Sequence, residues 1–240
     1  MKVQFLGTGT MGGDSRALTS FIVDDQILFD IGSGTVNRLK QLEFTPPQIQ
    51  YIFITHYHVD HFSDLLHFLL WRKIRNNIDQ PLTIVGPAEL KEKLINFIDL
   101  THNDHTWLKD LDALNIKIIS YENSTKTFTG FAVESIDVIH GRAKPCVGYV
   151  LEKDGIKLGY SGDSSDCPGL QRIYAKSDYI ITEATGLEGG DIHIGLDTVK
   201  SIAKENPNKS FYIVHRADYE TKPTDNVFFP NDGEIIEVTK

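Results

Sequence analysis

The sequence predicts an α/β (α+β) chain in which two mixed β-sheets pack face to face, with helices on their outer faces. Hairpin patterns occur in both halves of the chain, and amphipathic helices interrupt the strands in both halves. No low-complexity linker or internal repeat divides the 240 residues. We therefore expect a single domain over residues 1–240, which is long enough to bury a large core.

In the N-terminal half, short apolar runs bounded by turn residues predict strands at 3–6, 21–23, 27–29, 49–55 and 82–85. Asp24 and Asp25 separate the second and third runs, which predicts a hairpin there. Residues 60–75 and 88–100 instead place their leucines at helical spacing, and this predicts two amphipathic helices.

The C-terminal half repeats this style. Apolar runs predict strands at 116–120, 131–139, 147–151, 156–160, 179–182, 211–214 and 235–238, and helical spacing predicts a helix at 196–204. Asp154-Gly155 is a strong signal for a two-residue hairpin turn.

Composition excludes several classes of protein. The chain has 24 basic and 33 acidic residues, a net charge of −9, which argues against broad electrostatic binding of nucleic acid or anionic lipid. Its two cysteines, Cys146 and Cys167, form no CxxC pair, so we expect reduced thiols rather than a disulfide scaffold. No apolar run reaches about 18 residues, and the N-terminus lacks a signal-peptide core. We expect a cytoplasmic protein with no membrane partner.

The strongest chemical signal is a cluster of four metal-capable side chains, His56, His58, Asp60 and His61, directly after the run at 49–55. Imidazoles and a carboxylate without partners would be costly to desolvate at this point in the chain. A divalent ion accepts their lone pairs and removes that cost, and this donor set suits Zn²⁺ first, then Mn²⁺ or Fe. A polar loop with surface histidines is the weaker interpretation.

His56 and His58, at i and i+2, can face one ion, while Asp60 and His61 turn toward a neighbouring one. Four residues cannot complete two metal sites, so further ligands are expected at the ends of other strands. Three residues stand where an apolar strand runs into a loop: His140, Asp163 and His215. Each taken singly fits a structural or surface role better, but together with the cluster they complete a site.

His-x-His-x-Asp-His followed by a spaced His, Asp and His resembles the metallo-β-lactamase superfamily. Further motifs resemble its ribonuclease Z-like phosphodiesterase branch: Phe5-Leu6-Gly7-Thr8-Gly9-Thr10, Phe29-Asp30-Ile31-Gly32 and Glu183-Ala184-Thr185 followed by His193. The resemblance implies a four-layer αββα sandwich, two adjacent ions and a homodimer. It also implies the ligands: His56, His58 and His140 for the first ion, Asp60, His61 and His215 for the second, and Asp163 bridging both.

The chemistry expected of such a site is hydrolysis by a hydroxide held between the two ions. Asp60 could also orient or deprotonate the nucleophile. The resemblance places His193, supported by Glu183, as the group that protonates the departing alkoxide, whereas capping of the helix at 196–204 is the alternative role of His193. Three cations next to site residues are candidate substrate contacts, with a solvated loop as the equal alternative: Arg142, Lys144 and Arg216.

The chain departs from ribonuclease Z in two places. His140 and Asp163 are only 23 positions apart, and one hairpin fills that interval, so the tRNA-gripping arm is absent. Thr182 stands where the branch has the His of His-Glu-Ala-Thr. Arm-less relatives include cyclic-nucleotide phosphodiesterases, some of which phages use against nucleotide-based defence.

We therefore expect hydrolysis of a small phosphodiester such as a 3′,5′-cyclic nucleotide. A ribonuclease Z-type tRNA 3′-end endonuclease is the first alternative. A hydrolase of a lactone, lactam or thioester is the second alternative. A non-enzymatic metal-binding scaffold is disfavoured, because scaffold relatives tend to lose ligands and this set is complete.

Overall fold

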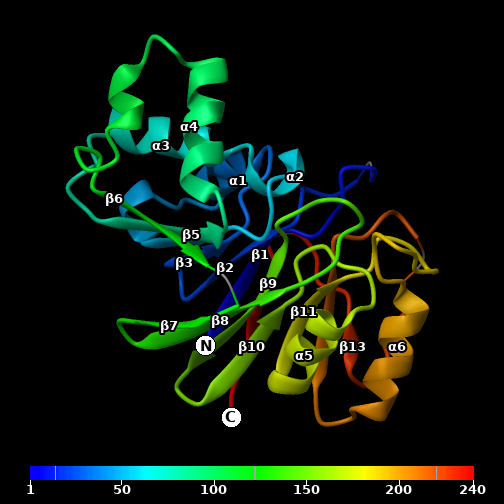
Figure 1. Ribbon diagram of the computed structural model, residues 1–240. Coiled ribbons are helices and arrows are strands. Elements are labelled where there is room, and N and C mark those ends of the chain that lie inside the picture. The colour runs from blue at the N-terminus through cyan, green and yellow to red at the C-terminus, as the bar shows by residue number, and fades with distance from the viewer. Residues whose placement is uncertain (14, 122, 220) are drawn as a thin grey trace.

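Two seven-stranded sheets form the centre of the computed structural model, which describes residues 1–13, 15–121, 123–219 and 221–240 (Figure 1). The first sheet has the order β14-β1-β2-β3-β4-β5-β6 and is antiparallel from β14 to β3 and parallel from β3 to β6. Its strands are β1 (Lys2–Gly7), β2 (Ser20–Val23), β3 (Ile27–Phe29), β4 (Tyr51–Phe53), β5 (Leu82–Pro87), β6 (Ile116–Tyr121) and β14 (Ile235–Glu237).

The second sheet has the order β13-β12-β11-β10-β9-β8-β7, parallel from β13 to β10 and antiparallel from β10 to β7. Its strands are β7 (Thr125–Phe128), β8 (Phe131–Asp137), β9 (Val147–Lys153), β10 (Ile156–Tyr160), β11 (Tyr179–Glu183), β12 (Ser210–Val214) and β13 (Val227–Phe228). Both sheets are therefore mixed, as the sequence predicts.

Helices cover both outer faces. On the first sheet lie α1 (Thr35–Gln41), α2 (Val59–Phe62), α3 (Leu65–Ile74) and α4 (Leu90–Thr101), with the short 3-10 turns η1 (Pro46–Gln48) and η2 (Thr106–Lys109) (Figure 1). On the second sheet lie α5 (Pro168–Lys176) and α6 (Leu196–Glu205).

Three layers of apolar side chains hold this sandwich together. The layer between the sheets is rich in aromatic rings: Phe21 stacks on Phe29 with ring centroids 4.8 Å apart, and Tyr160 meets Phe21 edge-on at 4.9 Å. Each outer layer joins one sheet to its helices. This arrangement confirms the predicted four-layer αββα architecture.

Most predicted elements are present, and the differences have physical reasons. The strand predicted at 49–55 is paired only over Tyr51–Phe53, and the one at 131–139 ends at Asp137. Sequence patterns did not reveal β7, β13, α1 or α5. The strand β7 is short and mostly exposed, and β13 has two residues, so neither carries a clear apolar signal. The predicted hairpin at Asp154-Gly155 is confirmed, with positive φ angles of 54° and 76°.

The helix predicted at 60–75 is two helices, because the backbone of Ile31 inserts between them. The Ile31 amide donates to the His61 carbonyl at 2.8 Å, and the Asp64 amide donates to the Ile31 carbonyl at 2.9 Å. Those two groups would otherwise bond within a continuous helix. The break lets α2 turn Asp60 and His61 inward, where both are buried.

Gly32 follows Ile31 at this contact, and it is predicted to tolerate no side chain. A Cβ on Gly32 would lie 1.8 Å from the carbonyl oxygen of Asp60. We expect Gly32→Ala to destabilise the protein by about 3 kcal/mol or more, because α2 must move away. Chemical denaturation measures this. Gly12→Ala is the matched control, since its Cβ would meet no atom within 4 Å. Equal midpoints for the two variants would contradict the prediction.

Within the described residues, no helix is both long and apolar enough to cross a membrane.

Candidate metal centre

The candidate ligands meet at one edge of the sandwich, where four strands end. His56, His58, Asp60 and His61 lie in the loop after β4 and in α2, and the other three follow β8, β10 and β12. Those three are His140, Asp163 and His215. The carboxyl ends of strands in an α/β sheet are where side chains from distant segments converge. The structure thus brings all seven sequence-predicted ligands together.

Asp163 is the hub of this cluster. Its carboxylate oxygens lie 3.9 Å from Nε2 of His56, 3.3 Å from Nε2 of His61, 3.8 Å from Nε2 of His140 and 3.3 Å from Nε2 of His215. Oδ2 of Asp60 lies 3.3 Å from Nε2 of His215 and 3.7 Å from Nε2 of His61. Ligands about 2.1 Å from a tetrahedral ion stand about 3.4 Å from one another, so these separations suit metal coordination.

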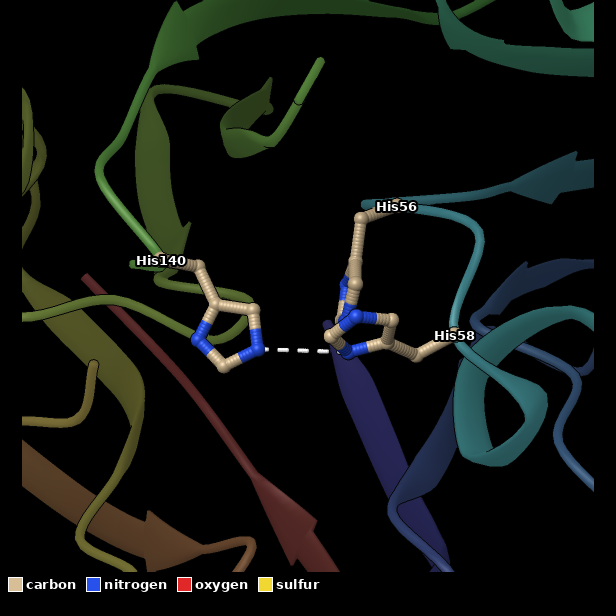
Figure 2. A group of neighbouring side chains, drawn as sticks. All are labelled: His56, His58 and His140. Atoms are coloured by element: carbon tan, nitrogen blue, oxygen red, sulfur yellow. Dashed lines mark hydrogen bonds between the residues drawn. The ribbon is translucent and has the colours of Figure 1, made fainter. Parts of the chain in front are cut away.

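Four overlapping groups of donor atoms in the described residues could hold an ion. Two of them include His193, once with His140 and Asp163 and once with Glu183 and His215, and the other two contain only the sequence-predicted ligands. One contains His56, His58 and His140, and Figure 2 shows their rings converging from two different loops. Nε2 of His140 lies 3.2 Å from Nδ1 of His58. The other group contains Asp60, His61, Asp163 and His215, all of them buried.

The unpaired atoms of the cluster fit a divalent cation. Four of its buried polar atoms have no hydrogen-bond partner: His56 Nε2, Asp60 Oδ1, His61 Nε2 and Asp163 Oδ1. A buried polar atom without a partner costs free energy, and a cation that accepts these lone pairs removes that cost. Imidazole and carboxylate donors suit Zn²⁺, Mn²⁺ and Fe alike.

In four of the histidines, a hydrogen-bond acceptor next to Nδ1 orients the ring so that Nε2 faces the cluster. Nδ1 lies 3.0 Å from the Thr55 hydroxyl in His56, 2.7 Å from the Asp30 carboxylate in His61, 2.9 Å from the Ile192 carbonyl in His140 and 2.9 Å from the Thr185 hydroxyl in His215. A proton on Nδ1 leaves the Nε2 lone pair facing the cluster. Such outer partners fix the tautomer of metal-binding histidines.

Asp30 is the most connected of these outer residues, and sequence reasoning noted it only as part of a family motif. It is fully buried with a positive φ of 54°. Its carboxylate accepts the Thr55 amide at 2.8 Å and the Tyr160 hydroxyl at 2.6 Å, besides the His61 ring. The strand-end position was the signal that could have marked it.

We expect Asp30→Asn to weaken metal binding about 10–100-fold, the usual effect of losing an outer carboxylate. The amide keeps one acceptor oxygen, but Oδ2 of Asp30 accepts both the His61 ring and the Tyr160 hydroxyl. An amide N–H group therefore faces both of these donors or, if the amide is flipped, the Thr55 amide. Competition with a chromophoric chelator measures the affinity. Tyr160→Phe removes a single bond to the same carboxylate and serves as a milder control. Unchanged affinity in the Asp30 variant would show that other contacts orient His61.

Protonation of the metal-free cluster is uneven. Burial disfavours charge on His61, but the carboxylates of Asp163 and Asp30 outweigh it and raise its pKa well above 6.5. Burial lowers the pKa of His56 well below 6.5 and also lowers that of His140. Burial alone would raise the pKa of Asp163, but the facing imidazoles hold it well below its usual range.

These shifts predict a maximum in the stability of the metal-free protein against pH. His56 and His140 have lowered pKa values, so their cost to stability grows as pH falls through the unfolded pKa of about 6.5. His61 has a raised pKa, so its contribution is full below about 6.5 and is lost as pH rises through the folded value. Thermal melts of chelator-treated protein from pH 5 to 10 test this. A monotonic rise in melting temperature would contradict it.

Beside the donor groups, Glu183 holds His193. The Glu183 side chain is only 1% exposed, and its Oε2 accepts Nδ1 of His193 at 2.8 Å. The His193 ring is 29% exposed and lies 4.7 Å from that of His140, centroid to centroid. Burial opposes charge on His193, but the Glu183 carboxylate raises its pKa above 6.5. Burial raises the pKa of Glu183 itself. His193 precedes α6, whose N-cap is Gly195, and it makes no side-chain cap there.

The three sequence-predicted substrate contacts are placed differently. Arg142 and Lys144 are exposed in the loop after His140. Arg216 is not at the rim: it is 1% exposed, donates to the Pro230 carbonyl at 2.6 Å and lies over the Phe229 ring at 5.4 Å. The structure thus places Arg216 inside the protein, directly after the residue at which the chain turns with a positive φ of 48°, His215.

Comparisons with known proteins agree with this geometry. A family model described as "Anti-Pycsar protein Apyc1" matches residues 1–231. The chain is 26% identical over 266 residues to ribonuclease Z of Thermococcus gammatolerans, covering 90% of this chain and 84% of that protein. Its fold is similar to that of human tRNase Z, short form, with a TM-score of 0.78, 22% identity and complete coverage of both chains. It is also similar to the metallo-β-lactamase fold protein YhfI from Bacillus subtilis, with a TM-score of 0.77, 18% identity and 98% coverage of each chain.

Proposed function

Because the chain belongs to the anti-Pycsar protein Apyc1 family, a metal-dependent hydrolase family in the ribonuclease Z-like branch of the metallo-β-lactamase superfamily, we propose that it hydrolyses a small phosphodiester. A 3′,5′-cyclic nucleotide is the substrate we favour. The observation that carries this proposal is that two groups of metal-capable side chains lie beside His193, whose Nδ1 is held by the buried Glu183 carboxylate.

Seven residues would hold two divalent ions, and Zn²⁺ is our first choice. His56, His58 and His140 would hold one ion, Asp60, His61 and His215 the other, and Asp163 both. Its contacts with four imidazoles support the bridging role. Such ions, when bound, lower the pKa of water and polarise a phosphoryl oxygen. The unpaired Oδ1 of Asp60 is free to orient the attacking water or accept its proton.

His193 would protonate the alkoxide that leaves. Its Nδ1 proton is held by Glu183, so Nε2 is the atom that can deliver a proton toward the cluster. The raised pKa of His193 keeps it charged over a wider pH range, which suits a general acid. An alkoxide is a poor leaving group and needs this proton, whereas a thiolate does not, so the arrangement favours phosphodiester cleavage over hydrolysis of a thioester.

The chain segment between His140 and Asp163 supports a small substrate. The strands β9 and β10 and their two-residue turn fill most of it, and this segment, which the structure describes throughout, contains no arm that could hold an RNA. The family description names a protein that acts against Pycsar. This agrees with the expectation of a cyclic-nucleotide phosphodiesterase used against nucleotide-based defence.

The similarity to ribonuclease Z over 90% of the chain supports a second candidate, tRNA 3′-end cleavage. Homodimerisation, a cytoplasmic location and contacts of Arg142 and Lys144 with phosphate stay predictions. The mass of the protein in solution tests the first of these.

The deciding experiment offers the metal-reconstituted protein four 3′,5′-cyclic nucleotides, with adenine, guanine, cytosine or uracil as base. A tRNA precursor with a 3′ trailer, a lactone and a thioester are assayed in parallel. We expect release of linear nucleotide and an intact precursor. Cleavage of the precursor alone would establish the second candidate. Hydrolysis of the lactone or thioester alone would overturn phosphodiester chemistry.

A further inference from the structure

We propose that Thr185 is a positioning residue that sets the tautomer and backbone of His215, and thereby the affinity of the second metal site. The proposal rests on the role of His215 as a ligand in the proposed function. It concerns a hydroxyl that is not itself a candidate ligand, and it makes Glu183 serve two histidines instead of one.

The position of Thr185 follows from strand pairing. The strands β11 and β12 are parallel, with Glu183 opposite Val214 as their last pair. The pairing continues past the strand ends. The Ala184 amide donates to the Val214 carbonyl at 3.1 Å, and the Ala217 amide donates to the Thr185 carbonyl at 3.1 Å. Thr185 is therefore held beside the chain segment that contains His215.

The Thr185 hydroxyl has three neighbours. It lies 2.9 Å from Oε2 of Glu183, 2.9 Å from Nδ1 of His215 and 3.2 Å from the His215 carbonyl oxygen. A hydroxyl has one proton and two lone pairs. When Glu183 is ionised, its Oε2 and the His215 carbonyl oxygen can accept a hydrogen bond but cannot donate one. Whichever oxygen takes the proton, a lone pair of Thr185 faces the ring of His215. The ring must then carry its proton on Nδ1, so its Nε2 lone pair points at Asp60 and Asp163, 3.3 Å from each.

The backbone of His215 needs this support as well. Its φ of 48° lies in the left-handed region, which is unfavourable for a residue with a Cβ and persists only when the surroundings hold it. The His215 amide donates to the Thr19 hydroxyl at 2.9 Å, and that hydroxyl in turn donates to the Gly9 carbonyl at 2.9 Å. Thr19 thus holds one side of the residue, and Thr185 holds the other side and the ring.

Glu183 connects this ligand to the leaving-group histidine. One carboxylate accepts His193 through both oxygens and Thr185 through Oε2. Removing the Thr185 hydroxyl leaves the contacts between Glu183 and His193 in place. Loss of Thr185 should therefore impair metal binding while leaving the proton donor intact, which separates its effect from that of His193.

The test measures metal binding by the full-length protein, with no substrate present. Thr185→Val, Thr185→Ala and Thr185→Ser are stripped with a chelator and titrated with Zn²⁺ against a chromophoric competitor. We expect the Val and Ala variants to bind the second ion about 10–100-fold more weakly. The Ser variant, which keeps the hydroxyl, should stay within about 3-fold of the unaltered protein. Two variants without the hydroxyl are included in case one fails to fold, as a thermal melt would show.

Thr182→Val is the matched control. Thr182 is buried in β11, three residues before Thr185, and its hydroxyl pairs with the Tyr174 hydroxyl at 2.6 Å and with the Glu183 carbonyl, neither of which is a candidate ligand. We expect it to change stability and leave Zn²⁺ affinity unaltered. The proposal is overturned if the Val and Ala variants bind both ions normally, or if Ser binds as weakly as Val, which would assign the effect to packing of the methyl group. Neither result depends on whether the protein cleaves cyclic nucleotides.

Discussion

Asp163→Ala is expected to lower hydrolysis at least about 10³-fold, equivalent to about 4 kcal/mol of transition-state stabilisation, and to reduce the bound metal below two ions per chain. The reason is geometric: this one carboxylate faces Nε2 of His56, His61, His140 and His215. Its loss removes a negative charge from between the two donor groups, so both sites weaken together. Elemental analysis after gel filtration gives the metal content, and initial rates give the activity.

Asp191→Ala is the matched control for Asp163→Ala. It removes the same charge from an exposed position two residues before His193. We expect full metal content and activity within about 3-fold of the unaltered protein. Retention of two ions and of turnover by the Asp163 variant would show that it is not a shared ligand, and the bridging assignment would fail.

His193→Ala is expected to retain both ions yet lose about 10²–10⁴-fold in kcat on a cyclic nucleotide, the range typical of a missing general acid. The loss should depend on the leaving group. A nitrophenyl phosphodiester releases a weakly basic phenolate that needs no proton, so the same variant should cleave it at nearly the normal rate. Comparing kcat for the two substrates measures this difference.

Glu183→Gln should show a weaker form of the same pattern, since it leaves His193 without its carboxylate but keeps the imidazole. If His193→Ala slows both substrates equally, His193 acts in metal binding or folding rather than on the leaving group. The alkaline limb of the pH profile is a second readout. A general acid with a raised pKa loses activity only as pH rises through that value, and this limb should disappear in the alanine variant.

Sequence patterns were sufficient to predict the features that depend on residues close together in the chain. Short apolar runs bounded by turn residues predicted most strands, because a strand buried on one or both faces must be apolar at those positions. His56, His58, Asp60 and His61 were found because their spacing is compact. His140, Asp163 and His215 were found because each follows an apolar strand, and the ends of strands meet at one edge.

The sequence by itself predicted two mixed sheets with outer helices and a cluster of metal-capable side chains, since these depend on residue type and spacing along the chain. The family resemblance carried by the same residues implied the αββα class, the assignment of ligands and the missing arm. Only the tertiary structure decided the partners of the Asp30 carboxylate and the contact of Thr185 with His215, because these contacts join segments between 25 and 130 residues apart. It also decided that Arg216 is buried and that Ile31 breaks the helix at Ser63 and Asp64. A hydrogen bond depends on where two chain segments meet in space, and that position is set by packing of the whole core rather than by the neighbours of either residue.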